Sequence, residues 1–70
     1  MYRYLSGKLR QLGIRQKDLA VNLGISKSQV SMRFNGWIPW KINEMYTIMD
    51  IIQAPPEELH IYFPPKGSAA

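Results

Sequence analysis

Apolar residues recur along this chain at spacings of three and four residues, which is the period of an α-helix. Leu5, Leu9 and Leu12 follow this period, and Gly13 comes directly after them as a typical helix end. The pattern predicts a first helix over about residues 4–12. No segment alternates between apolar and polar residues with a period of two. The chain is therefore predicted to be all-α.

A second helix is predicted over residues 16–23. It places Leu19, Ala20 and Leu23 on one side and ends at Gly24. Ala20 and Gly24 are both small, and small residues allow two helices to cross closely. We therefore expect this helix to pack tightly against its neighbour.

A third helix is predicted over about residues 27–35. Ser26 followed by Gln29 forms an S-x-x-Q capping box, which marks a helix start. The pair Asn35 and Gly36 marks its end. The helix is short and well delimited.

Two more helices complete a predicted compact bundle of five. One, over about residues 40–53, carries a helical stripe of large side chains: Ile42, Met45, Tyr46, Met49 and Ile52. The last begins near Pro56, a favoured residue in the first helical turn, and carries Glu57 and Glu58 close to the positive end of its dipole. We expect one domain over residues 1–63 and a flexible tail over 64–70.

The size and composition of the chain favour a binding module over an enzyme. Seventy residues leave little room for an enclosed active site. There is no cysteine, His60 is the single histidine, and Glu57 and Glu58 are explained by capping. We therefore expect no catalytic residues, no metal site, no cofactor and no small-molecule substrate.

The charge is divided unevenly along the chain. The overall net charge is +4, but residues 1–41 carry +7 and the remainder carries −3. Such an asymmetry orients a protein toward a polyanion, although a few surplus lysines on a solvated surface would give the same count. No apolar run is long enough to span a membrane. We expect a cytoplasmic protein without a membrane partner.

Residues 16–36, "QKDLAVNLGISKSQVSMRFNG", form a predicted helix, a short turn at a glycine, and a second helix. This segment resembles the helix-turn-helix motif of the phage repressor and Cro family, with Gln16, Ala20, Gly24 and Ile25 at matching positions. The later segment "PPEELHIYF" looks like the last helix of small regulators from temperate phages of Gram-positive bacteria. The resemblance implies a lambda-repressor-like fold and a recognition helix over about residues 27–35.

A recognition helix reads DNA bases with the side chains of its first turns. Val30 and Phe34 fall on the core side of the predicted helix. The residues on its outer side that we expect to contact bases are Lys27, Ser28, Gln29 and Met32. Met32 matches a groove-facing position of the family, where its thioether can pack against a thymine methyl; a contact with another protein explains it equally well. Gln29 has a competing role in the capping box.

The remaining candidate residues fall into two groups. Those expected to contact the DNA backbone are Gln16, Ser31, Arg33, Asn35 and Lys41. Those of a possible surface for a protein partner are Arg15, Met32, Trp37 and Trp40. Arg15 departs from the family pattern, which has Ser or Thr at the cap, because arginine offers no acceptor. For Trp37 and Trp40, packing over the core under a loop is the alternative.

The resemblance implies a Cro-type transcriptional regulator that binds double-stranded operator DNA in the lysis-lysogeny switch of a phage. A homodimer would have to use the last helix and the tail. The alternative is an antirepressor, similar to the modulator-of-repression proteins of lactococcal phages, that uses the same fold to bind the phage repressor. The basic half favours DNA, whereas Met32 and the aromatic residues favour the antirepressor.

Overall fold

The computed structural model describes residues 2–64, and within this range every regular element is helical. The elements are α1 (Arg3–Leu12), α2 (Gln16–Leu23), α3 (Lys27–Phe34), α4 (Ile42–Ile51), the short 3₁₀ turn η1 (Pro56–Glu58) and α5 (Leu59–Tyr62). The all-α prediction is confirmed. Apart from residue 64, the predicted tail lies outside the described residues.

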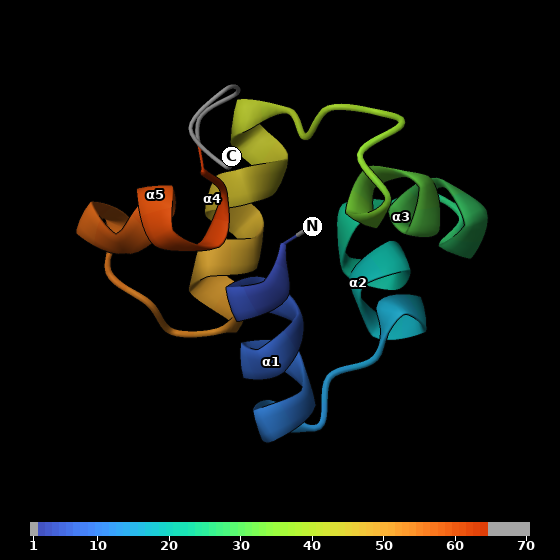
Figure 1. The fold of residues 1–70 in the computed structure, drawn as a ribbon. Helices are drawn as coiled ribbons and strands as arrows, with labels where there is room; N and C mark the ends of the chain where they lie inside the picture. Colours follow the sequence, from blue (N-terminus) through green and yellow to red (C-terminus); the bar gives the residue numbers. More distant parts are fainter. Residues whose placement is uncertain (1, 65–70) are drawn as a thin grey trace.

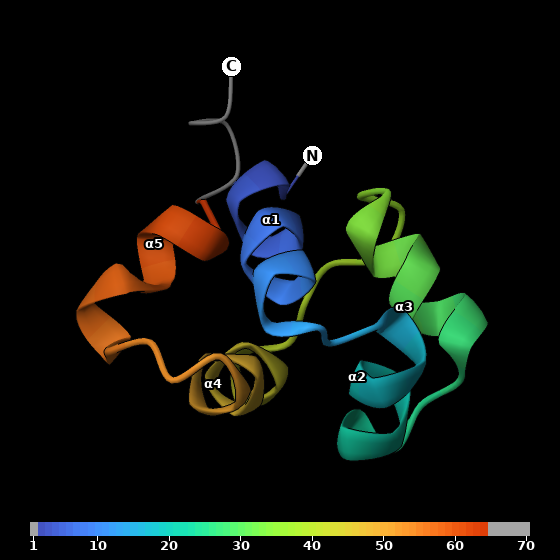
Figure 2. The ribbon, with the colours of Figure 1, turned by 90° about the horizontal axis from the view of Figure 1, so that it is seen from below.

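Helix α1 lies between the α2 and α3 pair on one side and α5 on the other (Figure 1). The view from below shows α4 on a third side of the bundle (Figure 2). Helix α2 packs on α3 and α4, and α5 packs on α1 and α4. The second and third helices thus form a unit at one side of the molecule, with the outer side of α3 turned away from the centre.

Apolar side chains from every part of the bundle meet in one core. The buried members are Leu5, Leu9, Leu19, Ala20, Val30, Trp40, Ile48, Met49, Ile52 and Phe63. The prediction of which side of α4 faces the core is partly wrong. Ile42 and Tyr46 are exposed, whereas Ile48 is buried. The core side of α4 follows Met45, Ile48, Met49 and Ile52, and the two exposed residues fall at its edge. Leu12, at the end of α1, is also exposed.

The turn between α2 and α3 depends on Gly24, which has φ of +70°. This left-handed conformation is strained for residues that carry a Cβ. A Cβ on Gly24 would meet no atom within 4 Å, so the expected close crossing at this position is wrong. Gly24 is required for the turn, whereas the small side chain packed at the crossing is the buried Ala20.

Helix α3 ends in a Schellman motif centred on Gly36, with φ of +81°. The amide of Gly36 donates to the carbonyl of Arg33 at 3.1 Å, and the amide of Trp37 donates to the carbonyl of Met32 at 2.9 Å. The predicted stop at Asn35 and Gly36 is confirmed. The second hydrogen bond holds the backbone of Trp37 beside that of Met32.

Candidate functional site

The start of α3 is fixed by the capping box that the sequence predicts. The Ser26 hydroxyl accepts from the Gln29 amide at 3.1 Å, and the Gln29 side-chain oxygen accepts from the Ser26 amide at 3.4 Å. The amide of the cap residue and one amide of the first turn are therefore satisfied, and the entry of the chain into α3 is set. Between Ser26 and Gln29 lie Lys27 and Ser28, and both side chains are exposed.

The predicted base-contacting residues differ in how free their side chains are. Lys27 and Ser28 make no side-chain hydrogen bond within residues 2–64, whereas the Gln29 oxygen is occupied in the capping box. A two-point contact of Gln29 with adenine needs both its oxygen and its nitrogen, so it would require the box to open. Met32 is half-buried, one turn further along.

Most predicted phosphate-contacting residues lie at the surface or close to it. Asn35 and Lys41 are exposed, and Gln16 and Ser31 are half-buried. Gln16 stands at the start of α2, close to Phe34 at the end of α3, and the others lie in α3 or beyond its end. This arrangement is compatible with the predicted set, with one exception.

Arg33 is that exception, and the expectation that it faces solvent is wrong. Its side chain is buried, with the residue 6% exposed, and its Nε and Nη2 donate to the two carboxylate oxygens of Glu44 at 3.1 and 3.3 Å. Its Nη1 also donates to the Gln29 carbonyl at 3.2 Å. Because its charge is neutralised inside the protein, Arg33 is not available to a phosphate.

Glu44, the partner of Arg33, was missed by the sequence analysis. It is 7% exposed and also accepts from the Lys41 amide at 3.0 Å, which caps α4. A signal was present in the spacing: Arg33 follows the buried Val30 by three residues, and Glu44 precedes the buried Ile48 by four. Opposite charges at two core-facing positions indicate a buried ion pair.

The two tryptophans that the sequence grouped together lie in different environments. Trp40 is 5% exposed and packs edge-to-face against Phe34, Phe63 and Tyr2, with ring centroids 5.4, 5.6 and 6.3 Å away. Its assignment to a partner surface is wrong, since it is a core residue beneath the loop. Trp37 is 77% exposed and remains available to a partner.

Arg15 occupies the cap position of α2, and its side chain is exposed. Its backbone amide donates to the Asp18 carboxylate at 2.9 Å. The reverse bond of a full capping box is absent here, because a guanidinium has no acceptor. Asp18 thus supplies half of a capping box, as its position in the first turn predicts.

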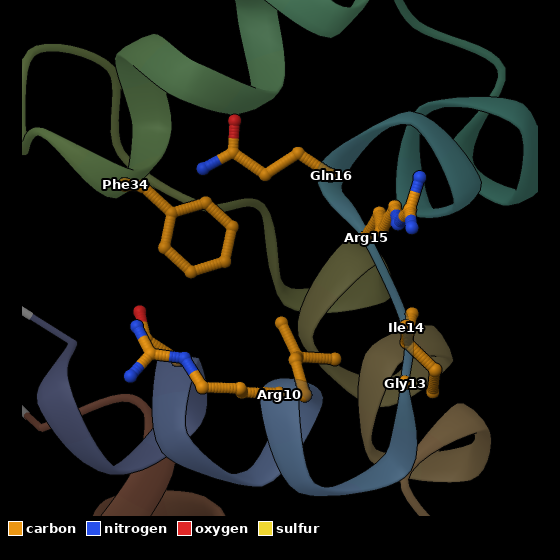
Figure 3. A pocket seen from close by; sticks show the side chains of 8 residues that line it. Arg10, Gly13, Ile14, Arg15, Gln16 and Phe34 are labelled. Atoms are coloured by element: carbon orange, nitrogen blue, oxygen red, sulfur yellow. The ribbon is translucent and has the colours of Figure 1, made fainter.

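A cleft of about 440 Å³ opens between α1, the start of α2 and the end of α3 (Figure 3). Its apolar wall is formed by Leu9, Ile14 and Phe34, and its polar rim includes Arg10, Arg15 and Gln16. In Figure 3 the Phe34 ring lies between the side chains of Gln16 and Arg10. Gln16 of α2 and Phe34 of α3 line the cleft, whereas the first turn of α3 lies outside it.

Comparison with known protein families finds a match over most of the chain. The family model described as "Protein of unknown function (DUF739)" matches residues 1–65. The chain belongs to the DUF739 family. The match includes all the helices of the described region, so the α2 and α3 unit and the cleft both fall inside the DUF739 segment. No curated protein matches the chain.

The charged groups of the DUF739 chain reinforce the basic character of the α1 to α3 side. Between residues 2 and 41, the one acidic residue is Asp18, which is bound to the Arg15 amide. The exposed cations of this range, in contrast, are Arg3, Arg10, Arg15, Lys17, Lys27 and Lys41. The segment that forms α1, α2 and α3 therefore carries a surplus of exposed positive charge.

No group of three histidine, aspartate or glutamate side chains between residues 2 and 64 is placed to hold a metal ion. No helix in this range has both the length and the apolar composition that crossing a membrane requires.

Proposed function

We propose that the chain is a sequence-specific DNA-binding transcriptional regulator of the Cro and repressor type, acting in the lysis-lysogeny switch of a phage. The observation that carries the proposal is the α2 and α3 unit, in which a capped helix presents exposed Lys27 and Ser28 at its first turn. The resemblance of residues 16–36 to the phage repressor and Cro motif supports the same function. Such a regulator acts in the cytoplasm of the bacterial host.

The dimensions of α3 suit the major groove. An α-helix with its side chains is about 10–12 Å across, and the major groove of DNA, about 12 Å wide, admits a helix of that diameter. Lys27 can donate to guanine O6 or N7, and the Ser28 hydroxyl can pair with several base edges. Met32, one turn later, can contact a thymine methyl. These contacts would give the sequence preference.

Phosphate contacts would position the helix without reading sequence. The proposed set is Gln16, Ser31, Asn35 and Lys41, and it omits Arg33. The buried pair of Arg33 with Glu44 has an indirect part in this scheme, since it ties α3 to α4. Glu44 also binds the Lys41 amide, so one carboxylate fixes the recognition helix and a phosphate-contacting residue together.

The proposal extends to a homodimer, because operators of Cro-type proteins are read as two half-sites by two-fold symmetric dimers. The last helix is the proposed contact, and Ile61 on α5 is an exposed large apolar residue. Sedimentation velocity of the chain with and without a duplex would test this extension.

The DNA proposal is tested by fluorescence anisotropy with labelled duplexes selected from a random-sequence pool. Binding should weaken steeply between 50 and 200 mM salt, by roughly 10³-fold or more if about six phosphates are contacted. Lys27→Ala should weaken binding and lower the preference for the selected sequence. Lys8→Ala is the matched control, since Lys8 lies on α1 in a shallow depression beside α5. Absence of binding at low salt would remove DNA as the principal partner.

A second function, binding of the phage repressor protein, is favoured by Trp37. This residue is 77% exposed, and its amide is bonded to the carbonyl of the half-buried Met32. An exposed tryptophan beside a methionine is typical of protein-binding surfaces. Titration of the chain against the repressor of the same phage would test it. Tight binding there, together with no DNA binding, would favour the antirepressor.

A further inference from the structure

Arg15 is placed at a cost to the stability of α2. A Ser, Thr, Asp or Asn at a helix cap binds a free amide of the first turn. Arg15 cannot do so, and its exposed side chain makes no hydrogen bond or ion pair within residues 2–64. No polar contact within the described chain therefore uses this guanidinium. A contact outside the chain would account for it.

The cleft beside Arg15 combines two kinds of surface. Its wall is apolar, with the buried Leu9 and the half-buried Ile14 and Phe34. Its rim carries Arg10 and Arg15, which lie at opposite ends of the view in Figure 3, and no acidic residue lines it. An occupant must therefore bring both negative charge and apolar surface.

We infer that this cleft docks an acidic segment of a partner protein, with carboxylates at Arg10 and Arg15 on either side of an apolar side chain that packs on Ile14 and Phe34. Guanidinium groups bind carboxylates through paired hydrogen bonds. A DNA backbone would satisfy the two arginines but would leave the apolar wall without a partner. The inference goes beyond the DNA-binding proposal and does not depend on it.

The apolar wall is held in place before any partner arrives. Phe34 packs edge-to-face on Trp40 at 5.4 Å and on Tyr2 at 6.2 Å, so its ring is fixed by the aromatic core. Pre-organisation of this kind lowers the entropy lost on binding. The flexible elements are the two arginine side chains, which can adjust to the spacing of the carboxylates.

The test is a selection of random 12-residue peptides displayed on phage, against the full chain. We expect the enriched peptides to carry Asp or Glu near a large apolar residue. The best peptide is then made with a fluorescent label, and a second copy is made with Gln and Asn in place of its acids. The copy without acids should bind about tenfold or more weakly, because its charge-assisted hydrogen bonds are lost.

Matched variants locate the binding site of that peptide. The double variant Arg10→Glu with Arg15→Glu should lose about tenfold or more in affinity through like-charge repulsion. The control, Arg3→Glu with Lys8→Glu, has the same change in net charge but lies outside the cleft, and it should bind almost as the wild type does. Thermal melting should show both double variants folded, since the Arg10 and Arg15 side chains are exposed.

Three results would overturn the inference. The first is enrichment of peptides without acidic residues, or of none. The second is an equal loss of affinity in both double variants, which would indicate a general effect of charge. The third is a cleft variant that binds every peptide normally but loses duplex DNA where the control keeps it; the cleft would then be a phosphate site.

Discussion

The side chains of Arg33 and Glu44 join the end of α3 to the start of α4 inside the protein, with Nε and Oε1 3.1 Å apart. Both carboxylate oxygens accept from the guanidinium, and one also accepts from the Lys41 amide. The remaining guanidinium nitrogen donates to the Gln29 carbonyl. This pair therefore fixes how the outer side of α3 is presented relative to α4.

Removing one partner of this pair should be costly, since a buried charge would remain unpaired. We expect Glu44→Ala to lower the free energy of unfolding by about 3–5 kcal/mol. The double variant Arg33→Met with Glu44→Leu should lose much less, because no charge is left inside. Urea unfolding followed by circular dichroism measures both, with the exposed Asp50→Ala as control. A double variant less stable than Glu44→Ala would show that the two residues are not coupled.

Phe34 connects the core to the cleft, and its removal should destabilise the domain. Phe34→Ala leaves a cavity beside Trp40 and Tyr2, and we expect a loss of about 3 kcal/mol. That is a large part of the stability of a small domain. Thermal melting would check it, with Phe34→Leu as a milder change. A shift of only a few degrees for Phe34→Ala would mean that the ring contributes little to the core.

Ionisation of Tyr2 should lower the stability of the fold at alkaline pH. Burial raises the pKa of the Tyr2 phenol above its ordinary value of 10.0. The folded state therefore keeps this proton at a pH where the unfolded chain has lost it. The contribution of Tyr2 to the stability of the fold is fully present below pH 10, and it is lost as the pH rises through the raised pKa of the folded state. Tyr2→Phe should show a shallower decline above pH 10 than the wild type. An identical decline would exclude Tyr2 as the cause; Tyr4→Phe, at an exposed site, is the control.

Local signals in the sequence were sufficient for most helix ends. The predicted bounds of the second helix agree with α2, and the Ser26 box and the Gly36 stop are observed in α3. Each depends on residues within a few positions of one another, so a single stretch of sequence specifies them. The fourth helix, predicted over about 40–53, is shorter in the structure, at Ile42–Ile51.

Contacts between distant segments were not predictable in the same way. Taken alone, Arg33 is an ordinary basic residue of α3. Its partner Glu44 lies eleven positions later and meets it only in the folded chain. Trp40 and Trp37 share one loop, yet only Trp40 meets Phe34 and Phe63. Which of the two tryptophans is buried depends on the path of the loop. The exposed Lys27 and Ser28 follow directly from the position of the Ser26 cap, and this part of the candidate site was predictable.

Met32 separates the two proposed functions. If it packs on a thymine methyl, Met32→Ala should weaken binding to the preferred duplex by about 1–3 kcal/mol and binding to random sequence far less. If it belongs to a repressor-binding surface with Trp37, DNA binding should persist and affinity for the repressor should fall by about 2 kcal/mol. Anisotropy and calorimetry measure the two. If neither affinity changes, Met32 is a surface residue without a role in binding. If Met32→Ala unfolds the chain, Met32 belongs to the core.

The first turn of α3 is the proposed DNA-binding surface. It is tested most directly by recording backbone amide resonances of the ¹⁵N-labelled chain while a duplex selected from the random pool is added. We expect the largest changes at Lys27, Ser28, Met32 and Gln16, and no change at Ile61 on α5. Large changes confined to α5, or none at low salt, would contradict it.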